Sequence, residues 1–543
     1  MINSITQGEA TMKMFSARAV WLGCGMAAVL SFVGTPIVSG QTVQTFTGTT
    51  SDFWTASTNW TPSGVPNSST SWAQIDSRST TGSPQKIFYP SSSLTANTMA
   101  VGAISFLPTL ALSSGTALSV QNNSSSIKGT LAFYGIDTTI GGTPRRIILD
   151  NSSALDSVSF TQTLAGQEFQ LNTSGVVNVA ANTQLTLSPK ITEVASPRTI
   201  TKIGSGILSF SGTNQESSLS TYSGGFVLED GIVQWASSGT AGSGTAFGLG
   251  PLTLQGGTLR STTTSGRSIN VDIVLDGGVT LGSIADGFTG NITINSNSGA
   301  LTTTIASDSV VTIPNGNLTI WNQATSGPGG LTKEGAGTLR FSGTGGNLTY
   351  SGNTIVQAGT LDLVGDMLGA GTLEVRSGGT FMGTSLITGA TTILAGGTLS
   401  PGASPGVLSF GDNLTLAGTT VMEIAGSTRE TDYDGIDVVG TLAYGGALDL
   451  QIPNILSNGT YDLFNGYASQ TGTFASITLT GAYTGSLTES SGVWTGSLGG
   501  QDITFTNATG DLSVVPEPSV LGLAGVVAAI AAARLRWRGQ GDR

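Results

Sequence analysis

Three aspartates in the segment TDYDGID, Asp432, Asp434 and Asp437, form the acidic cluster with the clearest chemical potential in this chain. Carboxylate oxygens held close together beside a glycine are ligands that Ca²⁺ accepts. The segment lacks the glutamate that completes the twelve-residue EF-hand pattern. A turn of solvated acids between two strands is the alternative, and it needs no ligand. Calcium is therefore the one candidate cofactor.

Three tryptophans, Trp54, Trp60 and Trp72, lie close together in the sequence. An indole face offers apolar area and polarisable edges, so exposed tryptophans could stack on sugar rings. The alternative is that these side chains fill the open first coil of a repetitive fold. The first interpretation predicts a carbohydrate-binding module, and the second predicts a structural cap.

The residue types that most enzymes use are scarce. Histidine is absent, which removes the usual general base and the commonest metal ligand, and the one cysteine is Cys24. Hydrolysis of glycosides by two carboxylates needs them roughly 5 to 9 Å apart in a cleft. The adjacent acids Glu229 and Asp230 would face opposite sides of a strand. We assign no catalytic residues and expect no enzyme, with a polysaccharide lyase or hydrolase as the enzymatic alternative.

The composition favours an acidic chain of many short strands. The formal net charge is −12, and a surface of that sign repels the phosphates of nucleic acids. Glycine accounts for 79 of 543 residues, roughly twice the usual share of about 7%. It follows no triplet period, and many Val, Leu and Ile residues intervene, so collagen and simple disorder do not fit.

A short phrase recurs through the second half of the chain, as GTLRFSG at Gly337, GTLDLVG at Gly359 and GTLEVRSGG at Gly371. Apolar residues alternate with small or polar ones in each copy, as in a half-buried strand. One such unit cannot cover its own apolar face, so we expect successive units to stack as a solenoid. The segment from Thr338 to Thr360 has a suitable length for one coil. A β-sandwich also explains the alternation, but not the copying.

Two longer segments align with each other: ITKIGSGILSFSG…YSGGFVLEDGIVQW (200–235) and LTKEGAGTLRFSG…YSGNTIVQAGTLDL (331–363). They resemble the autotransporter-associated β-strand repeat of secreted bacterial passenger domains. Residues 52–67 are similar to the Trp-rich start of many such proteins, and residues 396–450 to their C-terminal portion. The resemblance implies an all-β, right-handed parallel β-helix with terminal caps. The chain departs from true autotransporters because it ends behind a lone apolar segment and not a membrane barrel.

Residues 1–40 read as a secretory signal peptide. A basic start precedes an apolar stretch, and VSG before Gln41 offers a small-residue cleavage pattern between Gly40 and Gln41. A secretion translocon is therefore an expected partner.

The tail, residues 514–543, contains Pro516, Glu517 and Pro518, continues through the apolar segment 519–533, and ends in a basic cluster. This apolar segment is shorter than the ~20 residues that span a bilayer securely. The positive-inside tendency would hold the basic residues at the cytoplasmic side as a membrane stop. These basic residues are Arg534, Arg536 and Arg538.

This tail resembles the PEP-CTERM sorting signal of exported proteins in Gram-negative bacteria. The resemblance implies a transmembrane tether, recognition of Pro-Glu-Pro by an exosortase-type protease, and an association with exopolysaccharide and biofilm. A plain tail anchor is the alternative.

We therefore expect an exported structural or adhesin-like solenoid at the cell surface or in the extracellular matrix, with exopolysaccharide or surface glycans as partners. A sugar-binding module is the second interpretation. The predicted segments are a signal peptide (1–40), a Trp-containing cap with first strands (41–130), a β-solenoid (131–452), a C-terminal β cap (453–513) and the sorting signal (514–543).

Overall fold

A computed structural model gives the fold of the chain, and every residue that it describes belongs to one compact unit, Val38–Arg543. The described residues are 41–46, 54, 57–77, 85–89, 98–111, 117–122, 130–153, 155–161, 167–195, 197–211, 220–283, 290–297, 300–342, 348–365, 367–369, 371–402 and 405–517.

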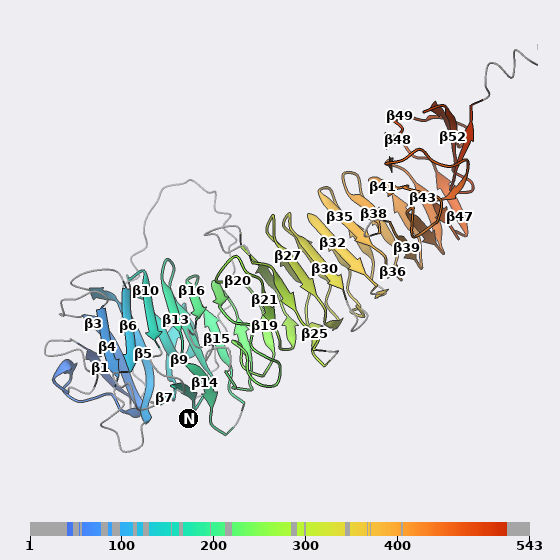
Figure 1. The fold of residues 1–543 in the computed structure, drawn as a ribbon. Helices are drawn as coiled ribbons and strands as arrows, with labels where there is room; N and C mark the ends of the chain where they lie inside the picture. The colour runs from blue at the N-terminus through green and yellow to red at the C-terminus, as the bar shows by residue number, and fades with distance from the viewer. Residues whose placement is uncertain are drawn as a thin grey trace, which may run out of the picture. The chain divides into compact units, whose positions relative to one another are not determined.

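The regular secondary structure of the described residues is almost entirely β-strand, and most strand pairs are parallel. The one helix among them is the short 3-10 turn η1 (Ser57–Asn59). From β15 (Ile200–Ile203) onward, parallel neighbours follow one another in sequence order, as Figure 1 shows by colour from green to orange. Before β15, the first sheet runs in the order β14 (Lys190–Glu193), β11 (Glu168–Leu171), β7 (Thr130–Phe133), β5 (Thr98–Ala111), β9 (Thr143–Asn151) and β12 (Gly175–Val179). The expected stack of parallel strands is therefore confirmed.

Three faces surround the core. The first face is a 16-stranded sheet that includes β15 (Ile200–Ile203) and ends at β28 (Ala324–Ser326), followed by a five-stranded sheet from β33 (Met367–Leu368) to β46 (Phe464–Asn465). Leu348 joins the two sheets, because it forms parallel bridges to both Thr325 and Leu368. The second face is a 16-stranded sheet from β4 (Gln85–Tyr89) to β47 (Ser469–Gly472).

The third face is an 11-stranded sheet that begins further along the chain. Its strands are β21 (Arg267–Ile269), β24 (Ile292–Ile294), β27 (Leu318–Trp321), β30 (Thr338–Ser342), β32 (Gly359–Val364), β35 (Gly379–Gly383), β38 (Thr398–Pro401), β41 (Thr419–Glu423), β44 (Ala447–Ile452), β48 (Ser476–Gly481) and β49 (Gly485–Ser486).

The register of the third face matches the predicted coil. Thr338 of β30 pairs with Thr360 of β32, so the chain completes one coil between these two residues. Leu339 pairs with Leu361, and both side chains are buried, whereas the threonines remain partly exposed. The alternation of the GTL phrase therefore places each leucine in the core, as the period of two requires.

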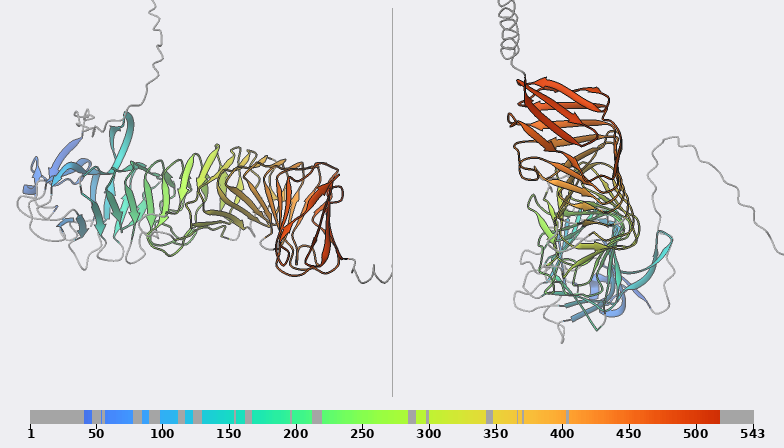
Figure 2. Two further views of the ribbon diagram at one scale, coloured as in Figure 1. Left: turned by 90° about the horizontal axis from the view of Figure 1, so that it is seen from above. Right: turned by 90° about the vertical axis from the view of Figure 1, so that its right-hand side faces the viewer.

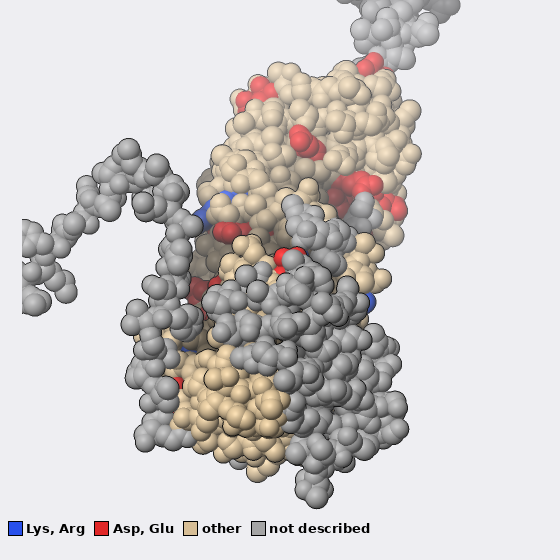
Figure 3. Space-filling model, turned by 90° about the vertical axis from the view of Figure 1, so that its left-hand side faces the viewer, with Lys and Arg blue, Asp and Glu red and all other residues tan. Residues whose placement is uncertain are grey.

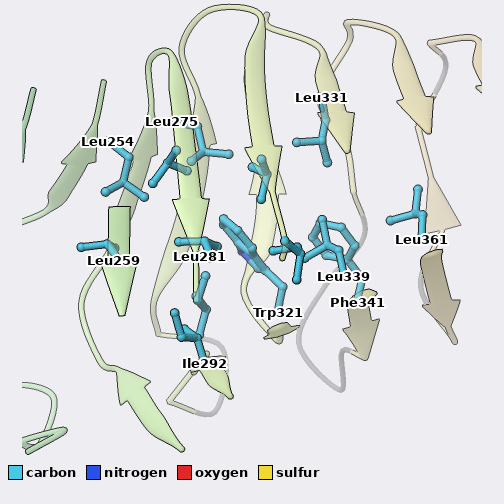
Figure 4. Close-up of a cluster of buried hydrophobic side chains, with 14 of the residues drawn as sticks. Leu254, Leu259, Leu275, Leu281, Ile292, Trp321, Leu331, Leu339, Phe341 and Leu361 are labelled. Carbon is cyan, nitrogen blue, oxygen red and sulfur yellow. The ribbon is translucent and has the colours of Figure 1, made fainter. Parts of the chain in front are cut away.

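The core is one continuous ladder of apolar side chains between the faces. In Figure 4, Trp321 lies between Leu281 and Leu339, with Phe341 alongside, and all four side chains are buried. Full burial of such a side chain is worth about 1.5–3 kcal/mol relative to exposure. Because parallel neighbours align like residues, each apolar position that recurs once per coil builds one row of the core, as Leu339 and Leu361 do.

The C-terminal strands change direction. β45 (Gly459–Asp462), β53 (Asp511–Pro516), β52 (Gln501–Thr506), β51 (Val493–Leu498) and β50 (Thr488–Ser490) form an antiparallel sheet, red in Figure 2. Phe505 of this sheet contacts Tyr444, Phe464 and Phe474 with ring centroids 6.0–6.2 Å apart. These aromatic contacts continue the core from the last parallel coils into the antiparallel sheet.

Candidate functional site

Two of the three tryptophans lie in the core and not on a surface. Trp54 and Trp60 are 1% and 2% exposed, and their ring centroids lie 4.7 Å apart in an edge-on contact. The Trp60 indole nitrogen donates to the carbonyl of Trp54 at 2.7 Å. Phe46 of β1 (Thr42–Phe46) packs against Trp60. Because their faces are covered by protein, these rings cannot stack on a sugar.

Trp72 belongs to a separate apolar cluster. It lies in β3 (Ser68–Ser77), is 7% exposed, and packs with Ala103, Ile136 and Ile147. The two isoleucines come from an antiparallel hairpin of β8 (Ile136–Ile140) and β9 (Thr143–Asn151). The Trp72 indole nitrogen donates to Ser105 Oγ at 2.9 Å. The stacking interpretation therefore fails for all three tryptophans, because their side chains are buried.

The three aspartates of the acidic segment each bind a different partner. Asp434 is buried, and its two carboxylate oxygens accept from the backbone N–H groups of Gly406 and Glu423, each at 2.8 Å. Asp432 accepts from the N–H of Thr428 at 3.0 Å, and this bond lowers the pKa of Asp432. Asp437 pairs with the Arg429 guanidinium at 2.7 Å.

These contacts do not build a calcium site. In the described part of the chain, no group of three or more acidic, cysteine or histidine side chains is placed to hold a metal. Burial raises the pKa of Asp434 to about 6, because a buried carboxylate loses its hydration. The carboxylates of this turn hold backbone and a guanidinium in place, which corrects the calcium interpretation.

A feature that the sequence reasoning missed lies in the first long repeat. Lys202 of β15 is fully buried, and it occupies a core position between Val177 and Leu228 on the neighbouring strands. Its ammonium group donates to the carbonyl of Ile203 at 2.9 Å, to that of Gly204, and to that of Asp230 at 3.1 Å. Asp230 belongs to the next coil, so the lysine joins two consecutive coils.

The second long repeat has the same arrangement. Lys333 of β29 (Leu331–Glu334) is fully buried, and its ammonium donates to the carbonyls of Glu334 at 2.9 Å, Gly335 at 2.8 Å and Ala358 at 3.0 Å. In both repeats the acceptors are the next two residues and one residue of the following coil. We call each of these three-carbonyl arrangements a lysine clamp.

The glycines of the TK-x-G-x-G phrase make the clamps possible. Gly204 and Gly335 both have φ of +73°, a conformation that turns a carbonyl toward the lysine and that side chains other than glycine rarely adopt. A Cβ atom on Gly231 would lie 2.7 Å from the Lys202 nitrogen, so the next coil also needs glycine there.

Burial lowers the pKa of each clamp lysine to about 8, because a buried ammonium loses its hydration. The signal was present in the sequence: the ITKI and LTKE copies place lysine two residues after Ile200 or Leu331, on the same side of the strand.

The outward side of the third face carries a row of threonines. Five consecutive strands align these residues in register, and all of them are partly exposed: Thr338, Thr360, Thr380, Thr398 and Thr419. Neighbouring strands lie about 4.8 Å apart, so hydroxyl groups recur at that spacing. In Figure 3, acidic residues form scattered patches on the view shown, with few basic residues among them.

The tail residues are described only at their start. Pro516 ends β53 and is exposed, as is Glu517, whose N–H donates to the carbonyl of Gly500 at 3.3 Å. Gln41 is also described, whereas Gly40, Pro518, Arg534, Arg536 and Arg538 lie outside the described residues. Within the described ranges, no helix is long and apolar enough to cross a bilayer.

Comparison with known proteins supports the repeat assignment. The passenger-associated transport repeat matches residues 200–234 and 331–363, the two segments that carry the lysine clamps. A segment of 86 residues, 16% of this chain, is 36% identical to the adhesin BmaC autotransporter of Brucella suis biovar 1 (strain 1330). That segment covers only 2% of the adhesin's length. No solved structure matches the chain significantly. The chain is therefore an all-β stack of parallel strands that contains two passenger-associated transport repeats.

Proposed function

We propose that this chain is an exported, non-enzymatic β-solenoid that acts as a structural, adhesin-like protein at the cell surface or in the extracellular matrix. The observation that carries the proposal is the pair of passenger-associated transport repeats built into a continuous parallel stack. The similarity to a segment of an autotransporter adhesin supports the same role.

The mechanism would be multivalent contact along a repetitive surface. Each of five consecutive coils of the third face, from β30 to β41, adds one threonine hydroxyl at about 4.8 Å from the last. A single hydroxyl contact is weak, but linked contacts reinforce one another because the later ones form at high effective concentration. Exopolysaccharide and surface glycans are the partners that suit a row of hydroxyl groups.

The tail would serve as a sorting signal. Pro516, the last residue of β53, and Glu517, which follows it, are both exposed, so a protease could reach them. We infer that a translocon exports the chain after cleavage between Gly40 and Gln41. An exosortase-type protease would then recognise Pro516–Pro518, while Arg534, Arg536 and Arg538 hold the tether at the inner membrane.

Cell fractionation with mass spectrometry of both chain ends tests this proposal. The expected product begins at Gln41, ends near Pro518, and lies at the cell surface or in the matrix. A deletion strain should lose surface adhesion or matrix cohesion. Recovery of the chain with intact Arg543 in the inner membrane would contradict the sorting, and turnover of a matrix polysaccharide by purified protein would contradict the non-enzymatic role.

A further inference from the structure

We propose that the outward side of the third face, near its C-terminal end, binds neutral oligosaccharides in a groove lined by Glu423, Gln451 and Thr480. This inference rests on the proposed function and names a ligand class and a site for it.

The groove consists of two adjoining hollows of about 280 and 150 Å³ that share Glu423 and Gln451. Thr480 and Pro453 complete the larger hollow, and Ser400 lies in the smaller one. The combined space falls within the usual range for small-ligand sites, about 300–1,000 Å³.

The polar lining is built by strand register. Glu423 of β41 pairs with Gln451 of β44, which pairs with Thr480 of β48. The three side chains therefore form a row that crosses the strands, with one hydrogen-bonding group about every 4.8 Å. Gln451 and Thr480 are both exposed. A linear ligand that lies along the stacking direction would meet one of them per coil.

The chemistry of the row favours a sugar over a peptide. β41 and β44 each pair with strands on both sides, so their backbone groups are not available to an added peptide strand. The side-chain amide of Gln451 and the hydroxyl of Thr480 are exposed, and these groups suit the many hydroxyls of a sugar. Val421 and Pro453 add apolar surface for the C–H side of a sugar ring.

The charge of the site selects among sugars. Glu423 lines both hollows, and Asp434 lies in the wall of the smaller one. Anionic oligosaccharides would be repelled by these groups and by the net charge of −12. None of the residues lining the two hollows is aromatic, so each bound sugar should be held weakly, as multivalent binding allows.

Titration calorimetry of the full chain tests the site. The probes are neutral hexasaccharides of glucose, mannose and galactose, with hexagalacturonate as the anionic comparison. At least one neutral probe should bind, and hexagalacturonate should bind at least about tenfold more weakly. The Gln451→Ala, Thr480→Ala double variant should lose about tenfold or more in affinity, because two hydrogen bonds are removed.

The matched control is Thr415→Ala, which removes an equally exposed threonine from β40 (Leu414–Leu416) on the second face and should leave affinity unchanged. Equal affinity of the double variant and the wild type would overturn the inference, as would the absence of binding to every neutral probe. Surface localisation and adhesion, measured in cells carrying the double variant, separate the two proposals. A protein that reaches the surface and adheres without binding in this groove would refute the groove alone.

Discussion

Lys202 and Lys333 are charged residues at core positions that neighbouring strands fill with valine or leucine. A buried charge is strongly unfavourable unless it is well hydrogen-bonded, and each ammonium has three carbonyl acceptors. The clamps therefore fix which two coils are adjacent at each repeat, a property that apolar stacking alone does not specify.

We expect Lys333→Met to lower the free energy of unfolding by about 2 kcal/mol or more, because carbonyls at the corner lose their donor. Chemical denaturation at pH 7 measures this change. The matched control is Lys190→Met, since Lys190 is partly exposed and lies 4.0 Å from Glu168; loss of such a surface pair costs about 0–1 kcal/mol. Equal stability of the two variants would refute the clamp.

The lysine clamps also predict a pH dependence. The pKa of Lys333 is about 8 in the folded chain, below its ordinary value of 10.5. Between these values the unfolded chain binds more protons, so the contribution of this group to stability rises with pH from about 8 to 10.5. Lys333→Met should show a smaller rise over that window in denaturation curves. A rise of the same size in both proteins would assign it to other groups.

The two repeats differ in the hydrogen bonding of a buried tyrosine. Tyr350 shares a 2.5 Å hydrogen bond with Thr354 Oγ1, whereas in the first repeat Phe226 replaces that threonine and the hydroxyl of Tyr222 is buried without a partner among the described residues. Tyr350→Phe should therefore cost about 1 kcal/mol of stability, and Tyr222→Phe should cost nothing or stabilise the chain. Thermal unfolding of both variants measures these changes in stability. A larger loss of stability from Tyr222→Phe than from Tyr350→Phe would contradict the difference in hydrogen bonding described here.

At the scale of strands, the two repeats form the same kind of corner, but between different pairs of faces. The first repeat turns from the first face, at β15, to the second face, at β16 (Ile207–Phe210). The second repeat turns from the second face, at β29, to the third face, at β30. The repeat therefore specifies a corner between two adjacent faces and not one particular face.

Removal of one whole coil tests whether the strands act as interchangeable units. Deletion of residues 360–379 joins Gly359 to Thr380, which already pairs with Thr360. We expect this variant to keep its β-sheet circular dichroism and a cooperative thermal transition. Deletion of residues 360–378 is the control, because a one-residue slip turns each side chain of the strand to the other face. If both deletions reduced the β-sheet circular dichroism and the cooperativity of the thermal transition equally, the stacking would be contradicted.

The alternation of the GTL phrase was enough to predict the strands, the buried side of each and the coil from Thr338 to Thr360, because these depend on local period. The tryptophans could not be placed in the same way. Their spacing in sequence does not say which side of the chain is covered, and Trp72 is buried by a hairpin that comes much later in the chain. The aspartates failed as a metal site because each carboxylate found a different long-range or backbone donor.

At the scale of the whole chain, the account depends on stacking without interruption. The second face alone holds 16 strands in sequence order, and the antiparallel sheet includes β45, which precedes the last of these strands in the chain. Function on this view comes from many equivalent coils, and it requires that the coils be in the register described.

Cross-linking between neighbouring coils tests that register directly. Thr338→Cys combined with Thr360→Cys, in a Cys24→Ser background, places two thiols on paired residues of adjacent strands. Their Cα atoms should lie about 4.8 Å apart, within the roughly 4.4–6.8 Å that disulfides accept. Thr338→Cys with Val364→Cys is the control, because the shift along the strand separates these two positions by roughly 14 Å.

Mild oxidation followed by peptide mass spectrometry identifies the cross-links. We predict a disulfide in the paired variant and none in the displaced control. Free thiols in the paired variant, or a disulfide in the displaced one, would contradict the coil-on-coil stacking on which this account is built.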